Sequence, residues 1–126
     1  MLAHPSVKVL GHRNDVPALM RDCDVFIMPS IEEGFGLVCT EAIASGCVPL
    51  VSDACTDLCR HESNSLVHAV GDVAAITEHI DRLNTNRMLL TQLRERGLKD
   101  IPSLTWSAAG ESLITAYKKV IALKAR

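Results

Sequence analysis

Residues 29–46, PSIEEGFGLVCTEAIASG, decide the fold, because they form a turn and a helix that follow a buried strand. The preceding residues 24–30, DVFIMPS, are almost wholly apolar, which is typical of a strand covered on both faces. After a glycine-rich turn, the predicted helix ends at Gly46, since glycine commonly closes a helix. The stretch therefore predicts a strand–turn–helix unit that carries Glu33 on the turn and Glu41 in the helix.

Similar signals lie on both sides of this unit. Strands are predicted at residues 7–11, 48–52 and 65–68, and helices at residues 15–23, from Asp72, at residues 86–97 and from Thr105. Alternation of strands and helices indicates parallel pairing with right-handed crossovers. The predicted fold class is α/β: an open parallel sheet, Rossmann-like, in three α/β/α layers with a helical C-terminal tail. His79 is expected on the exposed side of its helix.

Length and composition predict one globular domain over residues 1–126. A chain of this size buries roughly two thirds of its surface on folding, which is enough for one core. Hydrophobic residues make up 48% and aromatic residues only 3%, so aliphatic side chains must fill that core. The net charge of −2 offers no electrostatic attraction for DNA or RNA, and no nucleic-acid partner is expected.

Cysteine count and hydropathy point to the cytoplasm. No apolar run approaches the roughly 18 residues of a transmembrane segment, and no secretory signal opens the chain. Peripheral membrane association of a full-length protein stays open. Five cysteines without a signal peptide suggest reduced thiols. Because Cys55, Cys59, His61 and His68 do not follow a usual zinc spacing, no metal is expected.

The turn and the helix after it offer donors and acceptors for a sugar phosphate. Helix N-termini carry unpaired N–H groups and favour anions, and glycine lets a ligand approach the backbone closely. A diphosphate could therefore rest on the amides of Gly34 to Leu37. A helical side chain leans toward the N-terminus, so Glu41 could reach back and accept hydrogen bonds from a sugar diol. Glu33 would meet a second set of hydroxyls.

The alternative is a strand–helix junction whose glycines only make the turn. In that case Glu33 is a solvated acid at the positive end of the helix dipole. Glu41 fits this alternative less well, because it sits on a helix that is otherwise apolar all round. We expect a buried carboxylate without partners there to be costly.

The segment PSIEEGFGLVCTEAIASGCVPLVSD resembles the signature of the C-terminal domain of retaining GT-B glycosyltransferases, the group 1 class that includes glycogen synthase and many mannosyltransferases. That signature is Pro-Ser, Glu-Gly-Phe-Gly-Leu, then Glu-Ala and Ala-x-Gly-x-Pro-Val-Val. The matching residues are Pro29, Ser30, Glu33, Gly34, Phe35, Gly36, Leu37, Glu41, Ala42, Ala44, Gly46, Pro49 and Val51. The resemblance covers about residues 7–83.

The resemblance implies a nucleotide diphosphosugar as the donor and assigns roles to six residues. Glu33 is the implied catalytic residue, near the anomeric carbon, as a nucleophile or as an electrostatic partner. The donor-binding residues are Gly34, Phe35, Gly36, Leu37 and Glu41, of which the last holds the ribose. The family normally uses no metal and no other cofactor, since the helix dipole and basic side chains stabilise the departing diphosphate.

The chain departs from the family in two places. The arginine and lysine that grip the diphosphate precede the part of the fold present here, as does the acceptor-binding N-terminal domain. We therefore expect a part of a two-domain enzyme that is inactive alone. The loop after residue 52 is shorter, with Asp57 in place of a glutamate. Two alternatives stay open: a sugar-nucleotide epimerase of the same architecture, and a standalone interaction domain without catalysis.

Overall fold

Three parallel strands in the order β1-β2-β3 form the sheet of the computed structural model, which describes residues 4–124. The strands are β1 (Val25–Met28), β2 (Val48–Ser52) and β3 (Leu66–His68). Their register pairs Val25 with Val48, and Leu50 with Leu66. They confirm three of the four predicted strands. The ends of the expected single domain, residues 1–3 and 125–126, lie outside the described residues.

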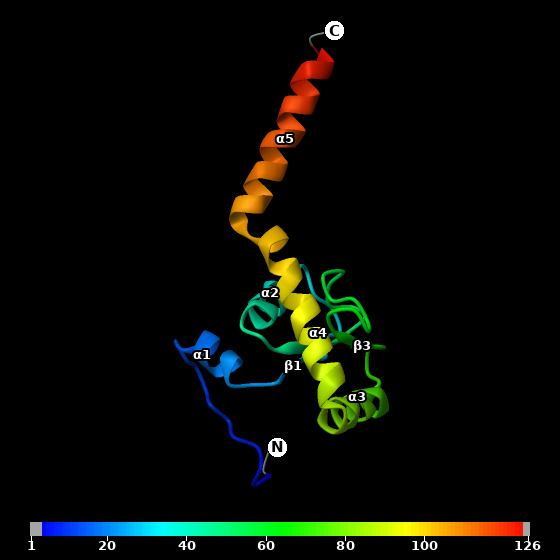
Figure 1. Cartoon of the computed structure of the whole chain (residues 1–126). Helices are drawn as coiled ribbons and strands as arrows, with labels where there is room; N and C mark the ends of the chain where they lie inside the picture. Colours follow the sequence, from blue (N-terminus) through cyan, green and yellow to red (C-terminus); the bar gives the residue numbers. More distant parts are fainter. Residues whose placement is uncertain (1–3, 125–126) are drawn as a thin grey trace.

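Helices follow the strands where the capping signals place them (Figure 1). They are α1 (Val16–Arg21), α2 (Leu37–Ala44), α3 (Val73–Thr85), α4 (Arg87–Asp100) and α5 (Trp106–Lys124), with a 3-10 turn η1 (Ile101–Leu104) before the last. The Asp72 carboxylate accepts a hydrogen bond from the Ala75 amide at 2.9 Å. Asn86 accepts one in the same way at the start of α4, at 3.0 Å. These side chains satisfy amides that the first helical turn leaves unpaired.

Alternate side chains of the strands enter buried clusters on the two faces of the sheet. On one face, Val48, Leu50 and Leu66 pack with Leu83 of α3 and with α4. On the other face, Phe26, Met28 and Val51 pack with α2 and the loop after β2. Because successive strand residues point to opposite faces, helices on both sides complete the three expected layers.

Two strand predictions were wrong. Residues 7–11 form no strand and are exposed, because no described strand lies beside them to share backbone hydrogen bonds. β1 was expected to be buried on both faces, yet Ile27 is 44% exposed. β1 pairs only with β2, so it is an edge strand, whereas all five residues of the central β2 are buried.

Two helix predictions were also wrong. Gly97 was expected to end α4, but the helix continues to Asp100 with Gly97 buried inside it. A Cβ at this position would lie 3.0 Å from Ile43 Cγ2, so Gly97 lets α4 approach α2 closely. His79 was expected to be exposed, but it is buried, with Nε2 3.3 Å from the Val67 carbonyl.

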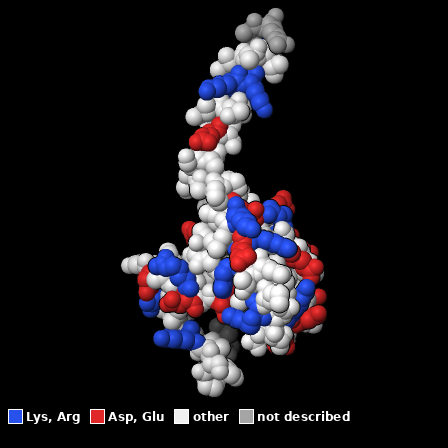
Figure 2. Space-filling model, viewed as in Figure 1, with Lys and Arg blue, Asp and Glu red and all other residues white. Residues whose placement is uncertain are grey.

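α5 extends away from the body of the protein (Figure 1). Its apolar side chains recur at helical spacing, as the sequence indicates, but those of residues 111–124 are exposed. Figure 2 shows this helix as mostly uncharged on the viewed face, in contrast to the mixed charges of the body. The exposed apolar residues are Trp106, Leu113, Ile114, Tyr117, Val120, Ile121 and Leu123. α5 therefore presents an apolar surface that the rest of the described chain does not cover.

Asp24 joins α4 to the amino ends of the strands. Its two carboxylate oxygens lie 2.8 Å from Arg87 and 2.8 Å from Arg94. Arg94 also donates from Nε to the Gly46 carbonyl at 2.6 Å. The hydrogen bonds from Arg87 and Arg94 lower the pKa of the Asp24 carboxyl. These contacts hold α4 against the residues that precede β1 and β2.

We expect Asp24→Asn to lower the free energy of unfolding at pH 7 by up to about 1 kcal/mol, the usual size for exposed ion pairs. A carboxyl whose pKa is lowered in the folded protein stabilises the fold at pH values above its unfolded pKa of about 3.9. This stabilisation is lost as the pH falls through the pKa of the folded protein. Urea unfolding should therefore show the two proteins converging below about pH 4. Asp22→Asn, at an exposed neighbour without an ion pair among residues 4–124, is the control. A pH-independent difference would contradict this role.

Two glycines inside helices should respond in opposite ways to alanine. Gly97→Ala should lower the free energy of unfolding by about 1 kcal/mol, because overpacking against the enclosed Ile43 outweighs the gain in helix propensity. Gly110 of α5 has open space around its Cβ position. Gly110→Ala should instead raise the helical circular dichroism signal. It should not lower the free energy of unfolding measured in urea. Equal effects at both positions would rule out the Ile43 contact as the cause.

Candidate functional site

The loop of residues 29–36 lies at the carboxyl end of β1, and the neighbouring strand holds it. Ser52, the last residue of β2, donates its hydroxyl to the Ser30 carbonyl at 2.6 Å. In open parallel sheets, ligands bind beyond this edge. The loop therefore occupies the usual binding position of the fold, and its start is fixed by a side chain of the central strand.

Gly36 is the point where the loop becomes helix α2. Its φ of +68° is left-handed, a conformation that favours glycine. A Cβ here would lie 3.2 Å from Thr56 Cγ2 and 3.5 Å from Cys55 Sγ. The loop after β2 thus packs directly on the Gly36 backbone, so both the φ angle and the space require glycine.

The N-terminus of α2 leaves amides free to bind a ligand. No side chain caps the helix, and the Cys39 amide donates to the Gly36 carbonyl at 2.8 Å. Within residues 4–124, the amides of Leu37 and Val38 have no hydrogen-bond acceptor. These donors lie at the positive end of the helix dipole, where an anion is stabilised.

Both predicted carboxylates are exposed. Glu33 accepts a hydrogen bond from the next amide, that of Gly34, at 3.0 Å. Glu41 makes no ion pair or hydrogen bond within the part of the chain that the structure describes. The expectation that Glu41 is a buried carboxylate was wrong. The buried residues of α2 are Cys39, Ala42 and Ile43.

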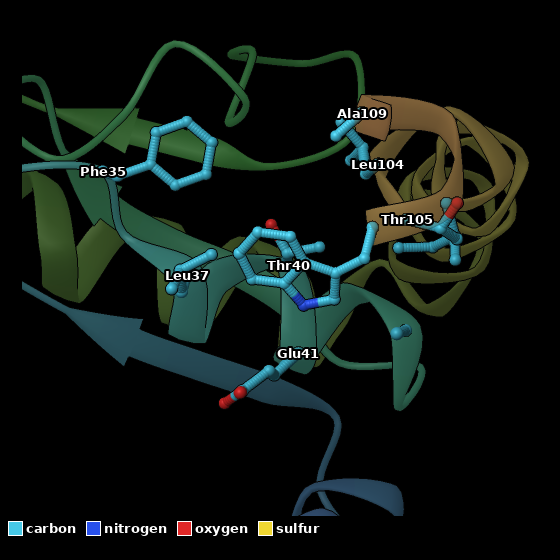
Figure 3. A pocket seen from close by; sticks show the side chains of 10 residues that line it. Phe35, Leu37, Thr40, Glu41, Leu104, Thr105 and Ala109 are labelled. Atoms are coloured by element: carbon cyan, nitrogen blue, oxygen red, sulfur yellow. The ribbon is translucent and has the colours of Figure 1, made fainter. Parts of the chain in front are cut away.

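A cavity of about 470 Å³ lies between α2 and the segment from η1 to α5 (Figure 3). Its walls are largely apolar. The lining residues are Phe35, Leu37, Thr40, Glu41, Ala44, Ile101, Leu104, Thr105, Trp106 and Ala109. Phe35, Leu37 and Glu41 of the predicted site reach this wall, whereas Glu33, Gly34 and Gly36 do not line it. Figure 3 shows the Glu41 carboxylate directed away from Phe35, Leu104 and Ala109.

The sequence does not reveal that Trp106 lines this cavity. Helical spacing places Trp106 only on the apolar side of the last helix. No local signal shows that the start of α5 lies against α2, more than 60 positions earlier in the chain. An exposed indole at the first position of a helix is the one feature that could have drawn attention to it.

Other polar residues near this edge are held locally or stand alone. Arg13 donates from Nε to Asp15 at 2.7 Å, and this bond lowers the pKa of the Asp15 carboxyl. His61 Nδ1 accepts a hydrogen bond from the Val67 amide at 2.9 Å. Asp57 is exposed. Among residues 4–124, no three His, Cys, Asp or Glu side chains form a group able to hold a metal ion.

The fold and the Gly36 junction agree with a family match. The family model described as "Glycosyl transferases group 1" matches residues 2–100, and the chain belongs to this family. The solved C-terminal domain of a group 1 glycosyl transferase from Francisella tularensis is similar in structure, with a TM-score of 0.69 and 22% identity. That match covers 77% of this chain and 51% of the other.

Curated relatives include enzymes with different substrates. The chain is 32% identical over 115 residues to the O-antigen chain mannosyltransferase B of Escherichia coli, covering 89% of this chain and 30% of the relative. It is 27% identical over 118 residues to N,N'-diacetylbacillosaminyl-diphospho-undecaprenol alpha-1,3-N-acetylgalactosaminyltransferase of Campylobacter jejuni, covering 92% of this chain and 31% of the relative. The chain thus spans about a third of the length of these relatives. No helix among residues 4–124 is long and apolar enough to cross a membrane.

Two glycines flank α2 and allow the Gly36 contact to be measured. Gly46, just past the end of the helix, has a φ of +91° and open space at its Cβ position. Gly46→Ala should cost about 1 kcal/mol of stability, from the left-handed backbone alone. Gly36→Ala should cost about 1 kcal/mol more, because it adds the clash with Thr56. Urea unfolding of both variants measures the difference, and equal costs would show that the Thr56 contact is soft.

Proposed function

We propose that this chain is the donor-binding part of a two-domain glycosyltransferase. The full protein would transfer a sugar from a nucleotide diphosphosugar to an acceptor, with retention at the anomeric carbon. The observation that carries the proposal is the junction at Gly36, where bare amides open a helix at the carboxyl edge of the sheet. The family match supports sugar transfer as the reaction.

The proposed roles follow from the chemistry of the exposed groups. The diphosphate accepts hydrogen bonds from the free amides at the start of α2, those of Leu37 and Val38, and the helix dipole stabilises its charge. Glu41 accepts hydrogen bonds from the ribose diol. Glu33 contacts sugar hydroxyls and stabilises positive charge at the anomeric carbon. The reaction needs no metal or other cofactor in this proposal.

The proposed partner of this chain is an N-terminal domain that binds the acceptor. The support is the length of the curated relatives, of which the chain spans about a third, and the uncovered apolar surface of α5. An exposed apolar patch of this kind marks a protein interface. We place the full enzyme in the cytoplasm, where nucleotide sugars are its donors.

Calorimetry with UDP, GDP and ADP tests the donor site, both on this chain and on a longer form with the N-terminal domain. We expect one of these nucleotides to bind and Glu41→Gln to weaken it about 10-fold or more, the usual effect of losing a hydrogen bond to a charged group. Glu33→Gln should leave nucleotide binding intact but abolish sugar transfer by the longer form. Glu32→Gln, at the exposed neighbour outside the family pattern, is the matched control.

Two results would contradict the proposal. One is that the longer form binds none of the three nucleotides. The other is that Glu41→Gln binds as well as the unchanged protein. An assay of products separates transfer from epimerisation, because transfer releases the nucleoside diphosphate whereas an epimerase returns an interconverted nucleotide sugar.

A further inference from the structure

Three buried cysteines lie behind the proposed donor loop and have no part in the proposed function. Cys39 belongs to α2, whereas Cys55 and Cys59 lie on the loop after β2. All three share one buried cluster with Val51. The sulfur atoms of Cys39 and Cys55 are 3.5 Å apart, although the residues are 16 positions apart in the chain. The pair therefore joins two separate segments of the fold.

Both members of this pair contact Gly36. The Cys39 amide donates to the Gly36 carbonyl at 2.8 Å. A Cβ on Gly36 would lie 3.5 Å from Cys55 Sγ, so the Cys55 side chain packs against the Gly36 backbone. A covalent bond that moves either cysteine should therefore also move the Gly36 backbone.

We propose that Cys39 and Cys55 form an oxidation site in which a peroxide converts the two thiols to a disulfide, and that this disulfide weakens donor binding by displacing Gly36. The second part rests on the proposed function, whereas the first does not. The bond would join α2 to the loop after β2. A disulfide has sulfur atoms about 2.05 Å apart, so the two sulfur atoms must approach by about 1.5 Å from their present 3.5 Å.

The chemistry balances with hydrogen peroxide as the oxidant. One cysteine, as the thiolate, attacks the peroxide and becomes a sulfenic acid as the O–O bond breaks, and the released oxygen leaves as water. The second thiol attacks the sulfenic sulfur and expels a second water. The two cysteines together lose two protons and two electrons, which reduce one peroxide to two waters. Because the second sulfur is already in contact, this closing step is intramolecular and fast.

The first step should be slow. Burial and the Cys39 thiol raise the pKa of the Cys55 thiol to about 12. The neighbouring thiol of Cys59, together with burial, raises the pKa of Cys39 far above its usual range. Thiols rather than thiolates are present at neutral pH, and thiols react poorly with peroxide. The attack on peroxide therefore occurs when the loop opens transiently, and the disulfide closes once the loop returns and the two sulfurs are again in contact. The exposed Cys23 reacts before either of them.

A peroxide time course on the full chain with Cys23→Ser tests the oxidation site. Samples are alkylated after denaturation and analysed by mass spectrometry. We expect two of the four remaining thiols to escape alkylation as one disulfide forms, with a linked Cys39–Cys55 peptide that dithiothreitol removes. Cys55→Ala and Cys39→Ala should abolish the linked peptide, whereas Cys47→Ala, at another buried cysteine, should retain it. Circular dichroism checks that each variant is folded.

Three outcomes of this test would overturn the site. The first is a chain that keeps four free thiols under conditions that fully oxidise Cys23 in the unchanged protein. The second is separate oxidation of single thiols to sulfinic acid. The third is a disulfide that joins a different pair, such as Cys39 with Cys59.

The coupling to the donor site needs its own measurement. The nucleotide that binds the reduced protein in calorimetry should bind the disulfide form at least threefold more weakly, and dithiothreitol should restore its affinity. Unchanged affinity would overturn the coupling while leaving the disulfide in place. If the reduced protein binds no nucleotide, the proposed function fails, and the mass measurement alone decides whether the oxidation site exists.

Discussion

The structure depends most on the contact between the Gly36 backbone and the loop after β2. A left-handed glycine starts α2, and Thr56 and Cys55 fill the space that a side chain would take. This close approach brings the ends of β1 and β2 together and directs the first amides of α2 outward. The hydrogen bond from Ser52 to Ser30 supports the same arrangement from the other end of the loop. The shape of the candidate site therefore depends on two loops that pack together, and not on one helix alone.

Local sequence signals predicted most of the helices and strands, since each of these signals consists of a few adjacent residues. β2 was predicted correctly because its residues are all apolar or small. This composition suits its central, buried position in the sheet. The helices α3 and α4 begin at Asp72 and Asn86, whose side chains cap them as predicted. Gly36 was singled out from the sequence, and its left-handed backbone agrees with that choice.

The errors all concern residues whose state depends on distant parts of the chain. Ile27 reads as buried, but it is exposed because β1 is at the edge of the sheet. Gly97 reads as a helix end, but it serves a close helix–helix contact with Ile43. Trp106 and Glu41 line the same cavity only because η1 contacts α2 and brings the start of α5 there. Sequence spacing carries no information about such neighbours, so the walls of the site could not be predicted as its loop was.

The long last helix has a thermodynamic consequence. Every residue from 111 to 124 is exposed, so this part of α5 shares no core with the body. A helix of such length is only marginally stable in water without packing. Its amides should exchange with solvent hydrogen far sooner than those of β2, by local melting and not by global unfolding. In isolation, the chain thus consists of two unequal cooperative units, and only the larger one carries the proposed donor loop.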